Sequence, residues 1–284
     1  MKKKALAALA VGALSAGALY TMAPTGDHSR KARLRPFEEV PVAHRGLFDN
    51  QSDHPENSTK AFSRAMEQGF CIELDVRLTK DGIPVVFHDE ELFRACGVKK
   101  KTEDCTAEEL QQYPLFSSIA TIPLLKDVLE QVNGAVPLVI EIKGEYDVNP
   151  ICTAVMALLS AYTGLYCIQS FSPFVLKWFR ENAPEVLRGQ LSMDFTDPQK
   201  ETGKPWLVKF TAKNLMGNAF SRPDFISYEL SGAENLPLTI SRRVFHAKTA
   251  AWTVRSEEEL NYAKKFFDII IFEGFLPQKT GVQK

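Results

Sequence analysis

Short apolar runs alternate with amphipathic stretches along most of this 284-residue chain, and this alternation constrains the fold more than any other feature. Each apolar run has the length of a buried strand, and most intervening stretches repeat their apolar residues at helical spacing. Because strands and helices in turn form parallel sheets, the sequence predicts an α/β fold. Strands are expected at residues 40–44, 71–76, 84–88, 137–143, 165–171, 186–191, 224–229, 250–254 and 267–272. Helices are expected at residues 58–68, 124–131, 151–161, 173–182 and 257–266.

The region from residue 40 to residue 284 has the size of a (β/α)8 barrel, which takes about 250 residues. One of the nine expected strands has to lie outside such a barrel. Only seven residues separate Val76 from Pro84, and a parallel crossover needs about a dozen or more. The intervening Asp81-Gly82 predicts a tight turn, after which the chain returns antiparallel. The predicted fold is therefore a TIM barrel with an antiparallel excursion after strand 2, preceded by a hydrophobic N-terminal helix.

The N-terminus has the composition of a membrane-directing segment. Three lysines follow Met1, and residues 5–22 form an Ala/Leu/Gly/Val-rich run. Small residues at 16–18 would suit a cleaved signal peptide, and the length of the run would also suit an uncleaved anchor. We expect residues 1–24 to be one of these, residues 25–39 to be a linker, and residues 40–284 to be the barrel. The protein is then membrane-associated through residues 5–22, or exported, with the side of the membrane left open.

Charge and cysteine content exclude some classes of protein. The formal net charge is -1, which argues against general affinity for nucleic acid, so no nucleic-acid partner is expected. The five cysteines do not occur at metal-finger spacing, and they are too few in a chain of this length to form a disulfide framework. They therefore do not indicate the compartment.

Three carboxylates at predicted strand ends indicate a metal site. Glu73 and Asp75 lie two residues apart in one strand, so both side chains point to the same face. Glu141 ends another strand, and Lys143 shares its face. Neighbouring carboxylates repel each other unless a cation lies between them, and Ca²⁺ and Mg²⁺ prefer oxygen ligands. A lysine beside such a cation suits a bound anion, for example a phosphate.

Two histidines complete the set of predicted site residues at the C-terminal ends of the strands, the face where barrel enzymes keep their chemistry. His44 ends the first strand, and His88 ends the excursion. Histidine suits proton transfer because its ordinary pKa, near 6.5, lets small changes in environment select either form. A divalent cation between two imidazoles is typical of a phosphodiesterase site.

These residues belong to an ordered set of motifs that resembles the glycerophosphodiester phosphodiesterase family, within the phospholipase-C-like superfamily of TIM barrel phosphodiesterases. The resemblance runs from about Val42 to the C-terminus. Its motifs are His44-Arg45-Gly46, Pro55-Glu56-Asn57, Glu73-Leu74-Asp75-Val76, Pro84-Val85-Val86-Phe87-His88-Asp89, Glu141-Ile142-Lys143, Ser170-Phe171 and Trp252-Thr253-Val254. The sequence departs from the family pattern at Arg255, where an asparagine is common, and at Phe272-Glu273, where Thr-Asp is usual. The segment at residues 47–54 is longer than usual.

The resemblance implies one divalent cation, Ca²⁺ or Mg²⁺, held by Glu73, Asp75 and Glu141, and acid-base catalysis by His44 and His88. It also implies hydrolysis of a glycerol-linked phosphodiester to glycerol phosphate and an alcohol.

Four further residues are expected to bind substrate. Arg45 and Lys143 would neutralise phosphate oxygens. Glu56 would either brace Arg45 or approach the metal, and Trp252 would either floor the glycerol pocket or pack in the core. Asn57 is expected to support the site or to cap the helix that begins at Ser58.

Two alternative functions remain open at this point. A related barrel could act on a lipid phosphodiester, for example as a lysophospholipase D with a lysophospholipid substrate. The domain could also be a catalytically silent binding module of the cell envelope, although intact histidines and carboxylates speak against silence.

Overall fold

The computed structural model describes residues 17, 19–25, 27–144, 147–200 and 203–277. Within these residues, each apolar run that was predicted as a strand forms one. Eight parallel strands close into a barrel, because β1 pairs with both β2 and β9. The strands are β1 (Val42–Ala43), β2 (Cys71–Leu78), β3 (Pro84–Val86), β4 (Leu138–Ile142), β5 (Tyr166–Ser170), β6 (Leu187–Ser192), β7 (Phe225–Glu229), β8 (Lys248–Val254) and β9 (Ile269–Phe272).

The antiparallel excursion is also confirmed. β3 pairs antiparallel with β2, with Val76 opposite Val86. The turn between them includes Gly82 at φ 77°, a conformation that favours glycine. The backbone N–H of Phe87 donates to the carbonyl of Asp75 at 3.0 Å, so the residues after β3 remain beside the C-terminal half of β2.

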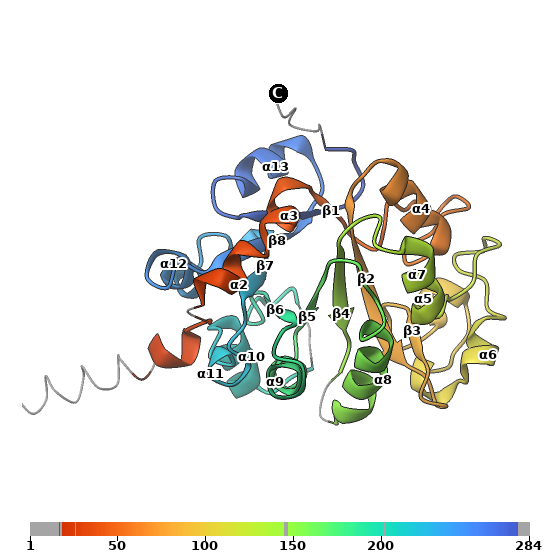
Figure 1. Ribbon diagram of the computed structural model, residues 1–284, viewed down its shortest axis with the longest axis horizontal. Coiled ribbons are helices and arrows are strands. Elements are labelled where there is room, and N and C mark those ends of the chain that lie inside the picture. The colour runs from red at the N-terminus through yellow and green to blue at the C-terminus, as the bar shows by residue number, and fades with distance from the viewer. Residues whose placement is uncertain (1–16, 18, 26, 145–146, 201–202, 278–284) are drawn as a thin grey trace, which may run out of the picture.

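Helices pack around the outside of the barrel (Figure 1). The five expected helices correspond to α4 (Thr59–Glu67), α7 (Leu125–Val132), α8 (Asn149–Leu159), α9 (Pro173–Asn182) and α13 (Glu257–Ala263). In α4 the Ser58 hydroxyl accepts a hydrogen bond from the N–H of Ala61, which caps the helix, and Phe62 is buried. The other α-helices are α2 (His28–Ala32), α3 (Arg35–Glu39), α5 (Phe93–Cys96), α6 (Ala107–Leu110), α10 (Trp206–Lys213), α11 (Asn218–Ser221) and α12 (Leu236–Arg243). Two 3-10 turns span Thr102–Asp104 and Leu230–Gly232.

The segment at residues 25–39, expected to be a linker, instead contains α2 and α3. Leu34 and Phe37 are fully buried beside inward-facing residues of the strands, such as Val42 and Phe225. Arg30 forms an ion pair with buried Asp224 at 2.6 Å. The apolar residues lie three apart and therefore share a helix face, which the barrel covers.

The expected hydrophobic helix at residues 1–24 falls largely outside the described residues. Residues 19–22 are helical. Among the described residues, no helix combines the length and the apolar character that crossing a bilayer requires.

Candidate active site

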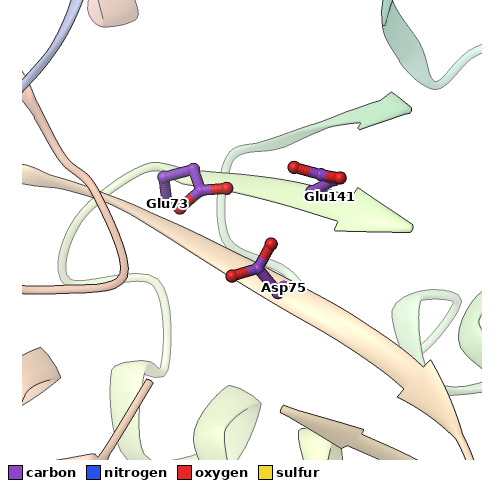
Figure 2. Close-up of side chains that lie close together, drawn as sticks. All are labelled: Glu73, Asp75 and Glu141. Atoms are coloured by element: carbon purple, nitrogen blue, oxygen red, sulfur yellow. The ribbon is translucent and has the colours of Figure 1, made fainter. Parts of the chain in front are cut away.

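Three buried carboxylates converge at the C-terminal ends of two neighbouring strands. Glu73 and Asp75 come from β2 and Glu141 from β4, and the strand register sets Asp75 directly opposite Glu141. One carboxylate oxygen from each residue lies within 4.8 Å of the others (Figure 2). The three residues that the sequence predicts as metal ligands are therefore brought together. Their hard oxygen donors fit Ca²⁺ or Mg²⁺.

Two cations partly compensate the charge of this carboxylate cluster. The Lys143 ammonium forms an ion pair with Asp75 at 2.8 Å and a short contact with Glu141. Burial and the charge of Asp75 together raise the pKa of Glu73 above its ordinary value. Burial also acts to raise the pKa of Asp75, but the charge of Lys143 and of other nearby cations outweighs it and lowers that pKa. Of the two carboxyl groups of β2, Glu73 therefore holds a proton more readily than Asp75.

The turn after β1 carries Arg45 into the carboxylate cluster. Arg45 has φ 54° and Gly46 has φ 82°, and this tight turn directs the backbone N–H of Arg45 to Glu73 Oε2 at 3.0 Å. The guanidinium lies 3.3 Å from Asp75 Oδ2 and donates to Glu56 Oε1 at 2.7 Å. Arg45 therefore contacts two of the three carboxylates.

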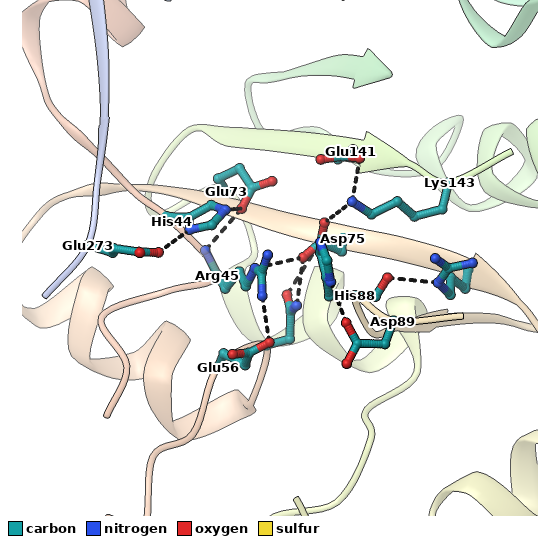
Figure 3. A network of polar contacts seen from close by, with 12 residues as sticks. His44, Arg45, Glu56, Glu73, Asp75, His88, Asp89, Glu141, Lys143 and Glu273 are labelled. Atoms are coloured by element: carbon teal, nitrogen blue, oxygen red, sulfur yellow. Dashed lines mark hydrogen bonds and ion pairs between the residues drawn. The ribbon is translucent and has the colours of Figure 1, made fainter. Parts of the chain in front are cut away.

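His44 lies between a cluster carboxylate and the carboxylate that directly follows the last strand. Its Nε2 is 3.9 Å from Glu73 Oε2, and its Nδ1 is 2.5 Å from Glu273 Oε2 (Figure 3). The Arg255 guanidinium donates to the other Glu273 oxygen at 2.8 Å. Burial acts to raise the pKa of Glu273, but the hydrogen bond and charge of His44, with the charge of Arg255, lower it to about 2. Glu273 is thus an ionised partner that fixes the ring of His44.

His88 has a similar arrangement near Asp75. Its Nδ1 lies 2.6 Å from Asp89 Oδ1, and Arg94 donates to the other Asp89 oxygen at 2.6 Å. Although burial acts to raise the pKa of Asp89, these two partners lower it. Arg77 also donates to the carbonyl of His88 at 2.8 Å. Each predicted catalytic imidazole therefore contacts a carboxylate through Nδ1, and each of these carboxylates is held by an arginine.

Glu56 braces arginines rather than joining the carboxylate cluster. Besides Arg45, it accepts from both terminal nitrogens of Arg94 at 2.6 and 3.0 Å, and from Asn50 at 2.9 Å. Asn57 donates to Asp75 Oδ2 at 2.9 Å. The prediction that Asn57 caps the following helix is wrong, because Ser58 is the cap. Asn57 instead holds a predicted metal ligand in place.

Trp252 lies at the rim of the barrel. The centre of its ring lies 5.5 Å from the centre of the Phe171 ring, in an edge-to-face arrangement. Its Nε1 is buried and has no hydrogen-bond partner among the described residues. Trp252 lines a cavity of about 370 Å³ together with Glu229 and Arg255. Because Arg255 also holds Glu273, this cavity adjoins the surroundings of His44. Trp252 is thus partly buried, and it both packs against the barrel core and borders this cavity.

Sequence reasoning left out three side chains that shape the site. Glu273 was noted only as a departure from the family pattern, although it directly follows the last strand and so had to lie at the same end of the barrel as His44. Arg94 belongs to the short helix α5, and nothing in its local sequence signals contact with Glu56. Gln169 is opposite Glu141 in the sheet and approaches Glu73 Oε1 at 3.5 Å.

Comparison with known proteins places these residues in a family context. A model of the glycerophosphoryl diester phosphodiesterase family matches residues 44–271. A glycerophosphodiester phosphodiesterase of Bacillus altitudinis is 43% identical over 108 residues, which are 36% of this chain and 43% of that protein. The human lysophospholipase D GDPD1 is 35% identical over 133 residues, which are 42% of this chain and 40% of that protein. The chain thus matches less than half the length of either relative.

The fold has counterparts among solved structures. One is an Oleispira antarctica phosphodiesterase in complex with the product sn-glycerol-3-phosphate. It superposes on this chain with a TM-score of 0.66 at 22% sequence identity, and the superposed region includes 82% of this chain and 92% of the Oleispira chain. That similarity concerns the fold alone. The family model, in contrast, covers well over half of this sequence, including His44 and the carboxylate cluster. The chain therefore belongs to the glycerophosphoryl diester phosphodiesterase family.

Proposed function

We propose that this protein is a phosphoric diester hydrolase that converts glycerophosphodiesters to glycerol 3-phosphate and an alcohol with one divalent cation. The observation that carries the proposal is the pair of imidazoles, His44 and His88, each held through Nδ1 by a carboxylate next to one buried acidic cluster. The product bound to the Oleispira antarctica protein supports this substrate class.

The protein's own groups have defined roles in this proposal. With Nδ1–H donated to Glu273 or Asp89, the free Nε2 of each ring exchanges protons with the substrate. One imidazole takes the proton of the attacking oxygen, and the other protonates the departing alkoxide. The attacking oxygen is either water or a substrate hydroxyl that first forms a cyclic phosphate.

Glu73, Asp75 and Glu141 would hold the cation. A bound Ca²⁺ or Mg²⁺ supplies positive charge that stabilises the phosphoryl oxygens as negative charge develops on them. Lys143 and Arg45, which contact the same carboxylates, add to this charge. Glu56 keeps the Arg45 guanidinium oriented, and Trp252 borders the substrate.

The test is release of glycerol 3-phosphate from glycerophosphocholine by the purified full-length protein, with EDTA or with added Ca²⁺ or Mg²⁺. We expect metal-dependent release, and a loss of roughly 10²-fold or more in His44→Asn and in His88→Asn, because asparagine keeps a polar atom near the position of Nδ1 but removes Nε2. His246→Asn, at an exposed site with φ 50°, is the matched control. Absence of turnover on a panel of diesters would favour a silent binding module.

A lysophospholipid is the second substrate that we propose. The membrane-directing composition of residues 5–22 and the similarity to human lysophospholipase D GDPD1 favour it. We also propose that residues 5–22 associate the protein with a membrane, as an anchor or as a signal for export. Release of choline together with lysophosphatidic acid from lysophosphatidylcholine would support this substrate. If the protein hydrolyses glycerophosphocholine but releases no lysophosphatidic acid, the enzyme is restricted to water-soluble diesters.

A further inference from the structure

Helix α10 presents four apolar side chains to solvent in its first five residues. All eight of its residues are described, and none is buried. Trp206 and Leu207 are 69% and 64% exposed, and Val208 and Phe210 are exposed as well. A helix on the surface of a globular protein ordinarily turns its apolar residues toward the core. The reverse arrangement marks an interaction surface.

Exposed apolar side chains also occur on α11 and among the N-terminal residues that contact it. Phe220 on α11 is exposed, and so is Tyr20. The Arg222 guanidinium lies 4.1 Å from the centre of the Tyr20 ring and donates to the carbonyl of Ala23 at 2.9 Å. Asn218 of α11 also donates to the carbonyl of Met22 at 2.8 Å, and Figure 1 shows residues 19–22 beside α11. Residues 20–23, which end the apolar N-terminal run, therefore contact α11 and its C-cap. We call the exposed apolar side chains of the two helices the α10–α11 surface (Trp206, Leu207, Val208, Phe210 and Phe220).

The charged side chains of the segment from residue 203 to residue 222 are all basic. Residues 203–222 contain three lysines and one arginine, but neither aspartate nor glutamate. Lys213 is paired with Asp194 at 2.7 Å, whereas Lys209 follows Trp206 by one helical turn. Tryptophan, phenylalanine and leucine combined with lysine and arginine are typical of segments that lie on anionic membranes. Such a composition complements acidic lipid head groups.

The α10–α11 surface adjoins the mouth of the barrel. The carbonyl of Ala212 accepts a hydrogen bond from Ser192 at 2.9 Å, and the carbonyl of Lys213 accepts one from Tyr228 at 3.3 Å. Ser192 and Tyr228 lie at the C-terminal ends of β6 and β7, the end of the barrel that carries the candidate active site.

We propose that the α10–α11 surface binds an anionic lipid bilayer, as a contact additional to residues 5–22, with Trp206 and Phe210 in the interface and Lys209 on the acidic head groups. The contact of α11 and its C-cap with the end of the membrane-directing segment, and the basic charge of residues 203–222, favour a bilayer over a second copy of the chain. When the α10–α11 surface is bound to the bilayer, the mouth of the barrel, which adjoins this surface, lies near the membrane. The proposal does not depend on the proposed catalysis.

Tryptophan fluorescence of the full-length protein tests the position of Trp206 directly. With vesicles of phosphatidylcholine and phosphatidylserine that carry brominated acyl chains, we expect quenching in the wild type and its loss in Trp206→Phe. Trp178→Phe, at a partly buried tryptophan of α9, is the matched control and should retain the quenching. Vesicle binding in which Trp206→Phe leaves the quenching unchanged would show that residues 5–22 bind alone, and would overturn the proposal.

Vesicle affinity tests the role of charge. Lys209→Gln should weaken binding to phosphatidylserine vesicles roughly fivefold and leave binding to pure phosphatidylcholine unchanged. Lys126→Gln, an exposed lysine on α7, should have no effect on either. Equal effects of both substitutions would contradict the proposal. So would concentration-dependent protection of Trp206 from iodide without vesicles, because that result identifies a second copy of the chain as the occupant.

Discussion

The orientation of the His44 imidazole depends on Glu273, a residue 229 positions further along the chain. Glu273 contacts Nδ1 on one side and Arg255 on the other. Both residues depart from the pattern of the family that the sequence resembles, and in the structure they contact each other. A glutamate is one methylene longer than the usual aspartate, and Arg255 holds its second oxygen. The two departures are therefore coupled by an ion pair.

Glu273→Gln should lower kcat by roughly 10- to 100-fold, because the neutral amide no longer stabilises a charged imidazolium. KM should change little, since Glu273 is not expected to touch substrate. Arg255→Gln is the control and should lose less, because Glu273 keeps its contact with His44. The measurement is steady-state turnover of glycerophosphocholine. A rise in KM at constant kcat would instead assign Glu273 to substrate binding.

Glu273 also makes the free energy of unfolding depend on pH. The pKa of Glu273 is lowered from the ordinary 4.5 to about 2 in the folded protein, so its stabilising contribution is complete above pH 4.5 and is lost as the pH falls toward 2. In urea unfolding of the metal-free protein, we expect Glu273→Gln to lose less stability over this window than the wild type. Parallel stability curves for the two proteins between pH 4.5 and 2 would contradict this.

Among the elements, β2 and β4 matter most because their register sets Asp75 opposite Glu141. Lys143, two residues after Glu141, then falls on the same face and forms ion pairs with both carboxylates. The pattern of alternate residues was enough to predict this cluster from the sequence. It was not enough to predict the contacts of Asn57 or Arg94, because those depend on how loops fold back over the strand ends.

Metal affinity should fall as the pH is lowered, because the raised pKa of Glu73 means that a proton competes with the cation for this carboxylate. We expect Ca²⁺ or Mg²⁺ to increase Tm more at about pH 8 than at about pH 6. Glu141→Gln should reduce the increase at both values, whereas Glu103→Gln, on an exposed turn, should not. A metal-induced shift that is independent of pH would argue against Glu73 as a ligand.

The turn after β1 depends on Gly46. A Cβ at this position would lie 2.9 Å from backbone and side-chain atoms of Ala61 and Phe62, and φ is +82°. Gly82 has φ +77° but open space around it. Gly82→Ala should cost about 1 to 2 kcal/mol in the free energy of unfolding, from backbone strain alone. Gly46→Ala should cost at least about 1 kcal/mol more and lower activity, since His44 and Arg45 share the turn. Equal losses in chemical denaturation would refute this reasoning.

At the scale of the whole molecule, most of the barrel could be predicted from the sequence, because apolar residues recur at different spacings in buried strands and in amphipathic helices. The segment between β6 and β7 could not, because α10 buries no side chain and so has no apolar stripe toward the core. The linker prediction for residues 25–39 failed for a different reason. Two apolar residues, Leu34 and Phe37, do not make a periodic pattern that indicates a helix. They belong to the core nevertheless, because they cover one end of the barrel.

Phe37→Ala should destabilise the barrel by about 3 to 5 kcal/mol, the usual cost of emptying a fully buried aromatic position. Phe93→Ala, at a side chain that is 55% exposed, should cost no more than about 1 kcal/mol. Both values come from urea unfolding of the full-length protein. A small effect of Phe37→Ala would mean that residues 25–39 detach without loss of the barrel.

Closure of the barrel through β1 and β9 has a consequence for biosynthesis. The first strand finds its second neighbour only in the last one, and the partner of His44 follows that last strand directly. On the ribosome, a nascent chain cannot assemble this pair until the residues up to Glu273 have emerged. A translation product that stops before Glu273 therefore lacks the carboxylate that contacts Nδ1 of His44.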